Sequence, residues 1–296
     1  MIDTAEPRRH RFGDRKDAWR VRGLDGLHTI FLYVMPKRTE SEVSLTEDID
    51  VTELMKFVKE ENDEKGTNLK FFHAFVTAVA KTARMRPRLN WFISGKRYWE
   101  RKDLTLSFIV KREFADGSDE SMLVLNCKPE LTLYDISKII LGDTAKVRKE
   151  GHNSMDDLLN VFGKFPRWFL TFFFFILRRL EYHGIMPNAL TDGDMNYSSI
   201  MLSNLGSIRC EAPYHHLSNY GTCSMMITIG TLHKEMVYDE NGEGTLRDIV
   251  SICVTADERI ADGFYFAKSI RLLKYILANP QLLCEPIGNA VEDYKD

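Results

Sequence analysis

The alternation of apolar and polar residues predicts strands, and spacings of three and four predict helices between them. Strand-like alternation covers residues 41–51, 104–110, 121–127, 198–202, 225–230 and 246–254. Helical spacing covers residues 51–60, 69–85, 132–149 and 264–277. The continuous apolar run 29–35 fits either a buried strand or a short helix.

A charged segment lies between the last predicted strand and the last predicted helix. Its sequence is Thr255-Ala-Asp-Glu-Arg-Ile-Ala-Asp-Gly263. The helix that follows carries one apolar stripe, which should pack on the sheet: Phe264, Ala267, Ile270, Leu273 and Leu277. Charged residues between a strand end and a helix start are well placed for binding or catalysis.

The composition is that of an ordinary globular protein, with 44% hydrophobic and 28% charged residues. A formal net charge of −3 gives no reason to expect nucleic-acid binding. The five cysteines form no Cys-x-x-Cys pair and no metal-ligand spacing, so we expect reduced thiols and no metal site. The first residues contain no apolar secretory core, which predicts a cytoplasmic protein.

One segment, which begins at Trp168 and ends at Leu177, is unusually aromatic. Basic residues flank it on both sides: Lys164, Arg167, Arg178 and Arg179. It fits a helix that is covered on all sides in the core or at a subunit interface, or a helix that contacts a membrane surface weakly. Its length is about half of the roughly 20 residues that a membrane-spanning helix requires.

The chain divides into a charged N-terminal arm over residues 1–22, a core over residues 23–285 and a C-terminal tail over residues 286–296. We expect the arm to be solvated and partly ordered. His73 lies beside the apolar stripe of the helix 69–85, and no nucleophile or carboxylate neighbours it in sequence. We therefore interpret His73 as a structural residue.

The segment Asp257-Glu258-Arg259-Ile-Ala-Asp262-Gly263 resembles the Asp-His-Arg-x-x-Asp-Gly signature of dihydrolipoyl acyltransferase catalytic cores, which belong to 2-oxo acid dehydrogenase complexes. The related chloramphenicol acetyltransferases carry His-x-x-x-Asp-Gly. Glu258 stands where the family has its catalytic histidine. Ser203-Asn204-Leu-Gly resembles the family's Ser-Asn-Leu-Gly, whose first serine donates a hydrogen bond to the oxyanion of the tetrahedral intermediate.

This resemblance implies a single α/β domain of the chloramphenicol acetyltransferase type, with a mixed, largely antiparallel sheet flanked by helices. It implies a homotrimer with the site between subunits, acyl-CoA as substrate and an acceptor that the sequence does not name. Asp262 would orient the base or join an ion pair, and Gly263 would make a tight turn. We expect no lipoyl group and no lipoyl or peripheral-subunit-binding domain on this chain.

The base of the reaction is the open question of the sequence. A glutamate has a reference pKa near 4.3 and is a weak base for a thiol near 8.5, so Glu258 predicts either an altered acyltransferase or a pseudoenzyme that binds acyl-CoA or a protein partner. Taken alone, Glu258 fits a salt-bridge residue. His215 and His216, which follow Ser203 in a loop, are an alternative base if the fold brings them to the serine.

Overall fold

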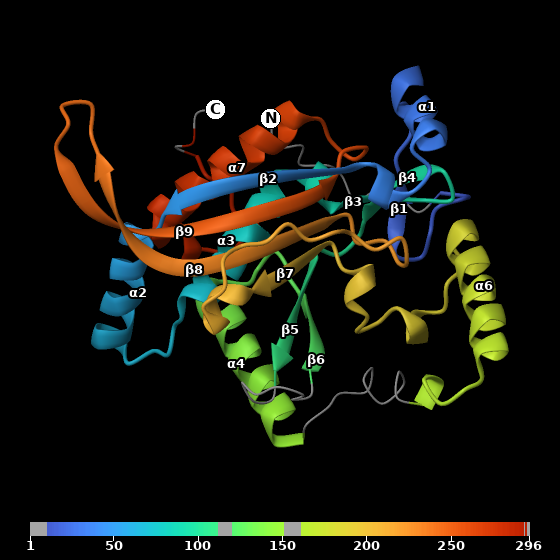
Figure 1. The fold of residues 1–296 in the computed structure, drawn as a ribbon, viewed down its shortest axis with the longest axis horizontal. Coiled ribbons are helices and arrows are strands. Elements are labelled where there is room, and N and C mark those ends of the chain that lie inside the picture. Colours follow the sequence, from blue (N-terminus) through green and yellow to red (C-terminus); the bar gives the residue numbers. More distant parts are fainter. Residues whose placement is uncertain (1–10, 112–119, 151–160, 293, 295–296) are drawn as a thin grey trace.

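The structure is a computed structural model that describes residues 11–111, 120–150, 161–292 and 294. Within them, the main sheet has the strand order β2-β9-β8-β7-β5-β6 (Figure 1). The strands are β2 (Glu42–Asp50), β5 (Thr105–Lys111), β6 (Glu120–Asn126), β7 (Ile200–Asn204), β8 (Met225–Tyr238) and β9 (Gly244–Asp257). β7 pairs in parallel with β5 and β8, while the other neighbours are antiparallel. The predicted mixed, largely antiparallel sheet is confirmed.

Four helices form the core with one face of this sheet: α2 (Thr52–Lys65), α3 (Phe71–Met85), α4 (Leu133–Glu150) and α7 (Gly263–Ala278). Alternate strand residues such as Val250, Ile252 and Val254 point into this core. The sequence predicted that α3 buries one stripe, but every residue from 73 to 83 is buried. The reason is that α3 is covered by the sheet and also by α2, α4 and α7.

The predicted stripe of α7 is partly wrong. Phe264 is 69% exposed and Ala267 is also exposed. Leu273 and Leu277 of the predicted stripe are buried, but in the first half of the helix Phe266 lies in the core instead. Apolar residues occupy two sides of this helix, so the spacing of three and four is satisfied by either stripe.

A second sheet has the order β1-β4-β3 and is built from β1 (Ala18–Arg20), β4 (Arg97–Arg101) and β3 (Trp91–Ser94). β1 comes from the predicted solvated arm, and Arg15 and Ala18 are buried. That part of the arm is therefore packed on the protein. In the predicted tail, Ile287 and Val291 are buried as well.

The remaining elements are short or peripheral. The apolar run 29–35 forms helix α1 (Gly26–Val34), whose first turn is capped by Asp25. The predicted turn at Asn241-Gly242 joins β8 to β9, and both strands extend further than their alternation indicated. Single turns of 3₁₀-helix are η1 (Arg38–Glu40), η2 (Pro87–Asn90), η3 (Asn188–Leu190), η4 (Met195–Tyr197), η5 (Leu205–Ile208) and η6 (Pro280–Leu283).

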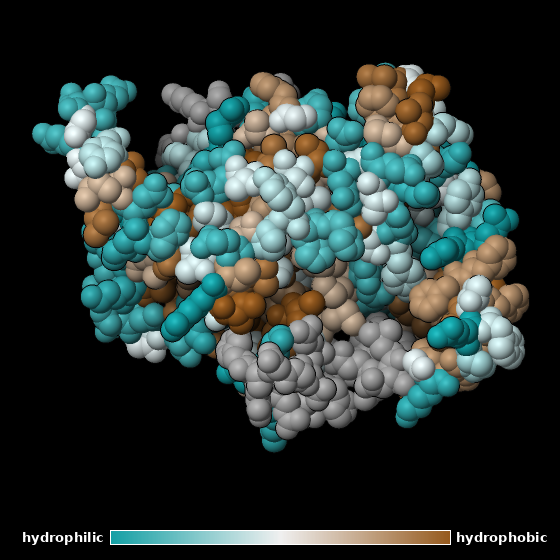
Figure 2. Space-filling view, viewed as in Figure 1, coloured by the Kyte–Doolittle hydropathy of each residue, from teal (hydrophilic) through white to brown (hydrophobic). Residues whose placement is uncertain are grey.

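The aromatic segment forms helix α6 (Arg167–His183) at the edge of the molecule. Trp168, Phe172 and Phe175 are 72%, 59% and 59% exposed, and of the helix only Leu177 is buried. Apolar side chains are visible over α6 in Figure 2. The interpretation as a core helix is thus wrong for the single chain. No helix in the described parts of the chain is long and apolar enough to span a membrane.

Candidate active site

Ser203 lies on the face of the sheet opposite the core helices. Ile200 and Leu202 on β7 point into the core, so Met201 and Ser203 point to the other side. There Ser203 lines a cavity of about 270 Å³ together with His215 and His216. No hydrogen bond joins the Ser203 hydroxyl to another described residue.

The segment around residues 209–224 covers this cavity. It is fixed to β8 by two hydrogen bonds, from Thr228 Oγ1 to the carbonyl of Pro213 at 2.8 Å and from Thr231 Oγ1 to the carbonyl of Cys210 at 3.1 Å. Gly206, the last residue of Ser-Asn-Leu-Gly, packs so closely that a Cβ there would lie 2.2 Å from the carbonyl oxygen of Gly230. Only glycine fits this contact.

The two histidines have one ring nitrogen each bound to a backbone carbonyl. His215 Nδ1 lies 2.8 Å from the carbonyl oxygen of His216, and His216 Nδ1 lies 3.1 Å from that of Leu217. A carbonyl oxygen accepts only, so Nδ1 carries the proton in each neutral ring. Nε2 then keeps its lone pair and is the atom able to take a proton.

Glu258 is exposed and lines neither this cavity nor the one described below. It follows β9 directly, and its backbone N–H donates to the carbonyl of Ser41 at 2.9 Å. Ser203 pairs with Thr228, and Thr228 pairs with Cys253. Glu258 is therefore two strands and five residues away from Ser203, roughly 19 Å at ordinary strand spacings. The two residues do not meet within one chain.

Asp257 and Arg259, which flank Glu258, form a buried ion pair. The Arg259 Nε and Nη2 atoms each donate to the Asp257 carboxylate at 2.7 Å, and Nη1 donates to the carbonyl of Met35 at 2.7 Å. A second buried guanidinium, that of Arg38, has its Nε 3.9 Å from Asp257 Oδ2. Burial lowers the pKa of Arg38, and the Asp257 charge opposes this shift.

The other predicted site residues lie outside the Ser203 cavity. Asp262 is exposed and caps α7, where its Oδ1 accepts the backbone N–H of Tyr265 at 2.7 Å. Gly263 is the first residue of that helix and has open space where a Cβ would stand. Asn204 ends β7, and its carbonyl accepts from the Ser207 hydroxyl at 2.8 Å.

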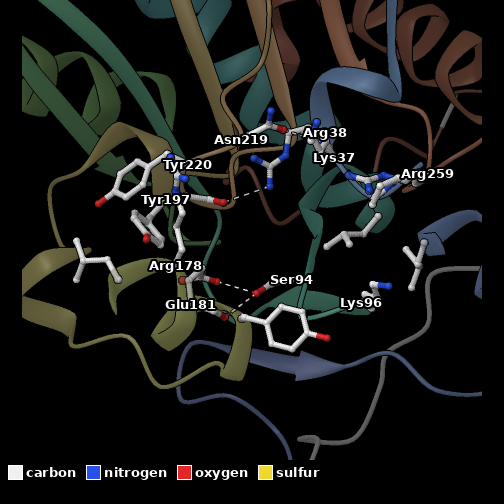
Figure 3. A pocket seen from close by; sticks show the side chains of 17 residues that line it. Lys37, Arg38, Ser94, Lys96, Arg178, Glu181, Tyr197, Asn219, Tyr220 and Arg259 are labelled. Atoms are coloured by element: carbon white, nitrogen blue, oxygen red, sulfur yellow. Dashed lines mark hydrogen bonds between the residues drawn. The ribbon is translucent and has the colours of Figure 1, made fainter. Parts of the chain in front are cut away.

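A second cavity, of about 240 Å³, lies between α6, the β3–β4 turn and the segment that carries Arg38 (Figure 3). Its charged lining residues are Lys37, Arg38, Lys96, Arg178, Glu181 and Arg259. Arg38 and Glu181 were not predicted from the sequence. Neither belongs to a motif, and their burial depends on contacts with distant parts of the chain.

His73 is buried, and its Nδ1 lies 2.8 Å from the Ser137 hydroxyl. Burial lowers the pKa of His73 to about 4. This environment agrees with a structural histidine. In the described part of the chain, no three His, Cys, Asp or Glu side chains are grouped so that they could hold a metal ion.

The fold is that of known acyltransferase cores. A probable dihydrolipoamide acetyltransferase from Listeria monocytogenes 4b F2365 aligns with 88% of this chain and 95% of its own, with a TM-score of 0.58 and 17% identity. The cubic core of a pyruvate dehydrogenase multienzyme complex aligns with 89% of this chain and 93% of its own, with a TM-score of 0.59 and 14% identity. The predicted fold class is thus confirmed.

The sequence comparisons agree with the fold. Residues 184–285 match the family model of the 2-oxoacid dehydrogenases acyltransferase (catalytic domain). The lipoamide acyltransferase component of the branched-chain alpha-keto acid dehydrogenase complex of Bacillus subtilis (strain 168) is 25% identical over 250 residues, which are 81% of this chain and 48% of that protein. This chain therefore spans about half the length of that relative. Over these residues the chain is similar to the 2-oxoacid dehydrogenase acyltransferases, in agreement with the resemblance of its motifs.

Proposed function

We propose that this protein transfers an acyl group from acyl-CoA to a thiol or hydroxyl acceptor in the Ser203 cavity. The observation that carries the proposal is that Ser203, His215 and His216 line one cavity. The name of the Bacillus subtilis relative, a lipoamide acyltransferase component, makes the thiols of dihydrolipoamide the first acceptor to test.

In the proposed reaction, a base takes the proton of the acceptor thiol, and the resulting thiolate attacks the thioester carbonyl. The Ser203 hydroxyl donates a hydrogen bond to the oxyanion that develops on that carbonyl. The tetrahedral intermediate then collapses and expels the thiolate of CoA, which recovers the proton from the base. The acceptor is acylated, and free CoA is the second product.

We assign the base to the His215–His216 pair, because these residues share the cavity with Ser203 and their Nδ1 atoms lie beside backbone carbonyls, which leaves Nε2 as the acceptor of a proton in the neutral ring. Glu258 could act on Ser203 only from a second copy of the chain, because about 19 Å separate them within one copy. In that arrangement Glu258 would hold the position of the family's histidine.

The test is acyl transfer from acetyl-CoA to dihydrolipoamide, followed by mass spectrometry of the acylated product. Removing one oxyanion donor typically lowers kcat by about a hundred- to a thousand-fold, so Ser203→Ala should do so. Removing a positioned base typically costs about a hundred- to ten-thousand-fold. We expect this loss in His215→Ala/His216→Ala, whereas Glu258→Gln should keep its activity. The reverse pattern would assign the base to Glu258.

The second candidate function is a pseudoenzyme that binds acyl-CoA or a protein partner without turnover. Glu258 in place of the family's histidine is the observation that favours it. Calorimetric titration with acetyl-CoA and CoA, read together with the transfer assay, distinguishes an active acyltransferase, a pseudoenzyme that binds acyl-CoA and a protein that does not bind acyl-CoA. Binding without turnover supports the pseudoenzyme, and no binding excludes both acyl-CoA functions and directs attention to protein partners.

We also propose a homotrimer. The similar solved structures include the core of a multienzyme assembly, and β2 lies at an edge of the main sheet, where its outer side has no strand partner among the described residues. Light scattering should give a particle of three times the chain mass of 34.3 kDa. A monomeric mass at micromolar concentration would contradict this proposal.

We further propose that α6 contacts anionic membrane surfaces. Its outward face presents Trp168, Phe172 and Phe175 between basic residues at both ends. Glu181, the only acidic residue of the helix, is turned inward to Arg15 and therefore leaves the exposed face positive. Aromatic residues beside cations are typical of helices that lie in the membrane interface.

Sedimentation with vesicles tests this contact. The wild-type protein should pellet with phosphatidylglycerol vesicles and much less with phosphatidylcholine vesicles, because the cations recognise negative lipids. Phe172→Ser/Phe175→Ser should abolish pelleting. The matched control is Val237→Ser/Tyr238→Ser on the β8–β9 hairpin, which also removes exposed apolar side chains. Equal pelleting of the two double variants would exclude α6 as the contact.

A further inference from the structure

The cavity beside α6 has an excess of positive charge. Glu181 is the one acidic residue among those described that line it. Five basic residues also line it: Lys37, Arg38, Lys96, Arg178 and Arg259. Asp257 lies behind Arg259 and offsets one of these charges. Figure 3 shows basic side chains on several sides of the cavity. Such a concave surface of one sign concentrates anions from solution.

Arg38 is the most unusual of these residues, because it is only 5% exposed and lacks a hydrogen-bonded carboxylate. Its Nη1 and Nη2 atoms donate to the neutral carbonyls of Ser218 and Gly221. Its Nε–H donates to no described atom, and the nearest carboxylate, that of Asp257 at 3.9 Å, is already held by Arg259. A buried N–H that donates no hydrogen bond is costly, so the Arg38 Nε–H favours a bound acceptor.

The wall of the cavity opposite Arg38 carries a hydrogen-bond acceptor, on Glu181, and a hydroxyl that can donate, on Tyr197. Glu181 Oε1 accepts from Arg15 at 2.7 Å and from Ser94 at 2.9 Å, but Glu181 Oε2 is buried without a donor. The hydroxyl of Tyr197 is also buried without a hydrogen bond. Burial raises the pKa of Tyr197, so the hydroxyl stays neutral and able to donate. Apolar residues complete the lining: Leu32, Ile93 and Leu177.

We propose that this cavity is a binding site for a small organic oxyanion. Its phosphate or carboxylate group accepts from the Arg38 Nε–H, and a hydroxyl or amino group of the same molecule donates to Glu181 Oε2. The volume of about 240 Å³ is below that of common drug-sized pockets, which favours a compact ligand.

The oxyanion site and the acyl-transfer cavity share a wall. Tyr197 and Asn219 line the oxyanion site, whereas their neighbours Asn196 and Ser218 line the Ser203 cavity. Arg38 fixes this wall, since its backbone N–H donates to Asn219 Oδ1 at 2.9 Å and its guanidinium holds the Ser218 carbonyl. A bound oxyanion would therefore contact the same wall that bounds the acyl-transfer cavity.

Calorimetric titration of the full chain with inorganic phosphate at low salt tests the site. We expect saturable binding that weakens roughly ten- to a hundred-fold in Arg38→Gln, the range of a charged hydrogen bond. Because this variant also loses contacts to Ser218 and Gly221, the rim variant Lys96→Gln/Arg178→Gln is measured in parallel. Each rim cation should contribute up to about fivefold. Lys56→Gln/Lys146→Gln makes the same charge change on α2 and α4 and should keep the wild-type affinity.

Two further titrations identify the source of the oxyanion. Tight binding of glycerol 3-phosphate would support a free metabolite, and binding of phosphatidylglycerol vesicles that Arg38→Gln weakens would support a lipid headgroup. The proposal is overturned if neither phosphate nor glycerol 3-phosphate binds and Arg38→Gln leaves vesicle binding unchanged. It is also overturned if the rim variant and the Lys56→Gln/Lys146→Gln control lose affinity equally.

Discussion

Asp257→Asn should destabilise the protein strongly. Asp257 is fully buried, and its two carboxylate oxygens each accept from Arg259 at 2.7 Å, with Arg38 at 3.9 Å. Asparagine preserves the size of the side chain but removes its charge, so two buried guanidinium groups lose their shared anion. Removing one partner of a buried ion pair costs about 3–5 kcal/mol, and we expect the free energy of unfolding to fall by that amount.

Urea unfolding followed by circular dichroism measures this change. In a heat denaturation, about 2–4 °C per kcal/mol for a chain of this size corresponds to a decrease in Tm of roughly 6–20 °C. Glu258→Gln is the matched control, because it neutralises the exposed neighbour and should change the free energy by less than about 0.5 kcal/mol. A loss below about 1 kcal/mol in Asp257→Asn would refute the argument that the buried charges depend on this carboxylate.

Three further measurements test individual structural assignments. Because burial lowers the pKa of His73 to about 4, below the value near 6.5 of an unfolded chain, the unfolded state binds the proton first. Stability should therefore fall by up to about 3 kcal/mol between pH 6.5 and 4, and the fall should be shallower in His73→Gln; parallel pH profiles would contradict this. Asp262→Ala should cost about 0.5–2 kcal/mol in urea through the lost cap of α7, while Asp262→Asn stays near wild type. Gly206→Ala should lower Tm because its Cβ meets the carbonyl of Gly230 at 2.2 Å, whereas Gly142→Ala, which meets open space, should not.

The sequence predicted the main sheet well because period-2 alternation reports directly which strand residues face the core. It was less accurate where burial depends on distant contacts. Arg15 looked like part of a solvated arm, but its guanidinium binds Glu181, which lies 166 residues further along the chain. Similarly, the all-round aromatic character of α6 could not distinguish a covered helix from an exposed one, since both satisfy the same pattern.

The candidate site was predictable only in parts. Ser203 became a candidate because its tetrapeptide resembles a known motif, and that motif also contains Gly206, which is closely packed in the structure. That Ser203, His215 and His216 line one cavity depends on the path of the covering segment, which hydrogen bonds from Thr228 and Thr231 help to hold. No local pattern encodes those contacts. The oxyanion cavity was missed for the same reason, because Arg38 becomes buried only when distant segments close over it.

Glu258 can reach Ser203 only from a second copy of the chain, whereas the His215–His216 pair lies in the same chain as Ser203. This difference can be measured by mixing two variant chains. If Glu258 of one copy acts on Ser203 of another, Ser203→Ala and Glu258→Gln are each inactive alone. When they are unfolded and refolded together, hybrid particles would contain interfaces with both intact residues and would regain part of the activity. If the base is the His215–His216 pair, Glu258→Gln is active by itself, and the mixture shows only the average of the two proteins. Recovery above that average would therefore overturn our assignment of the base and place the site between subunits.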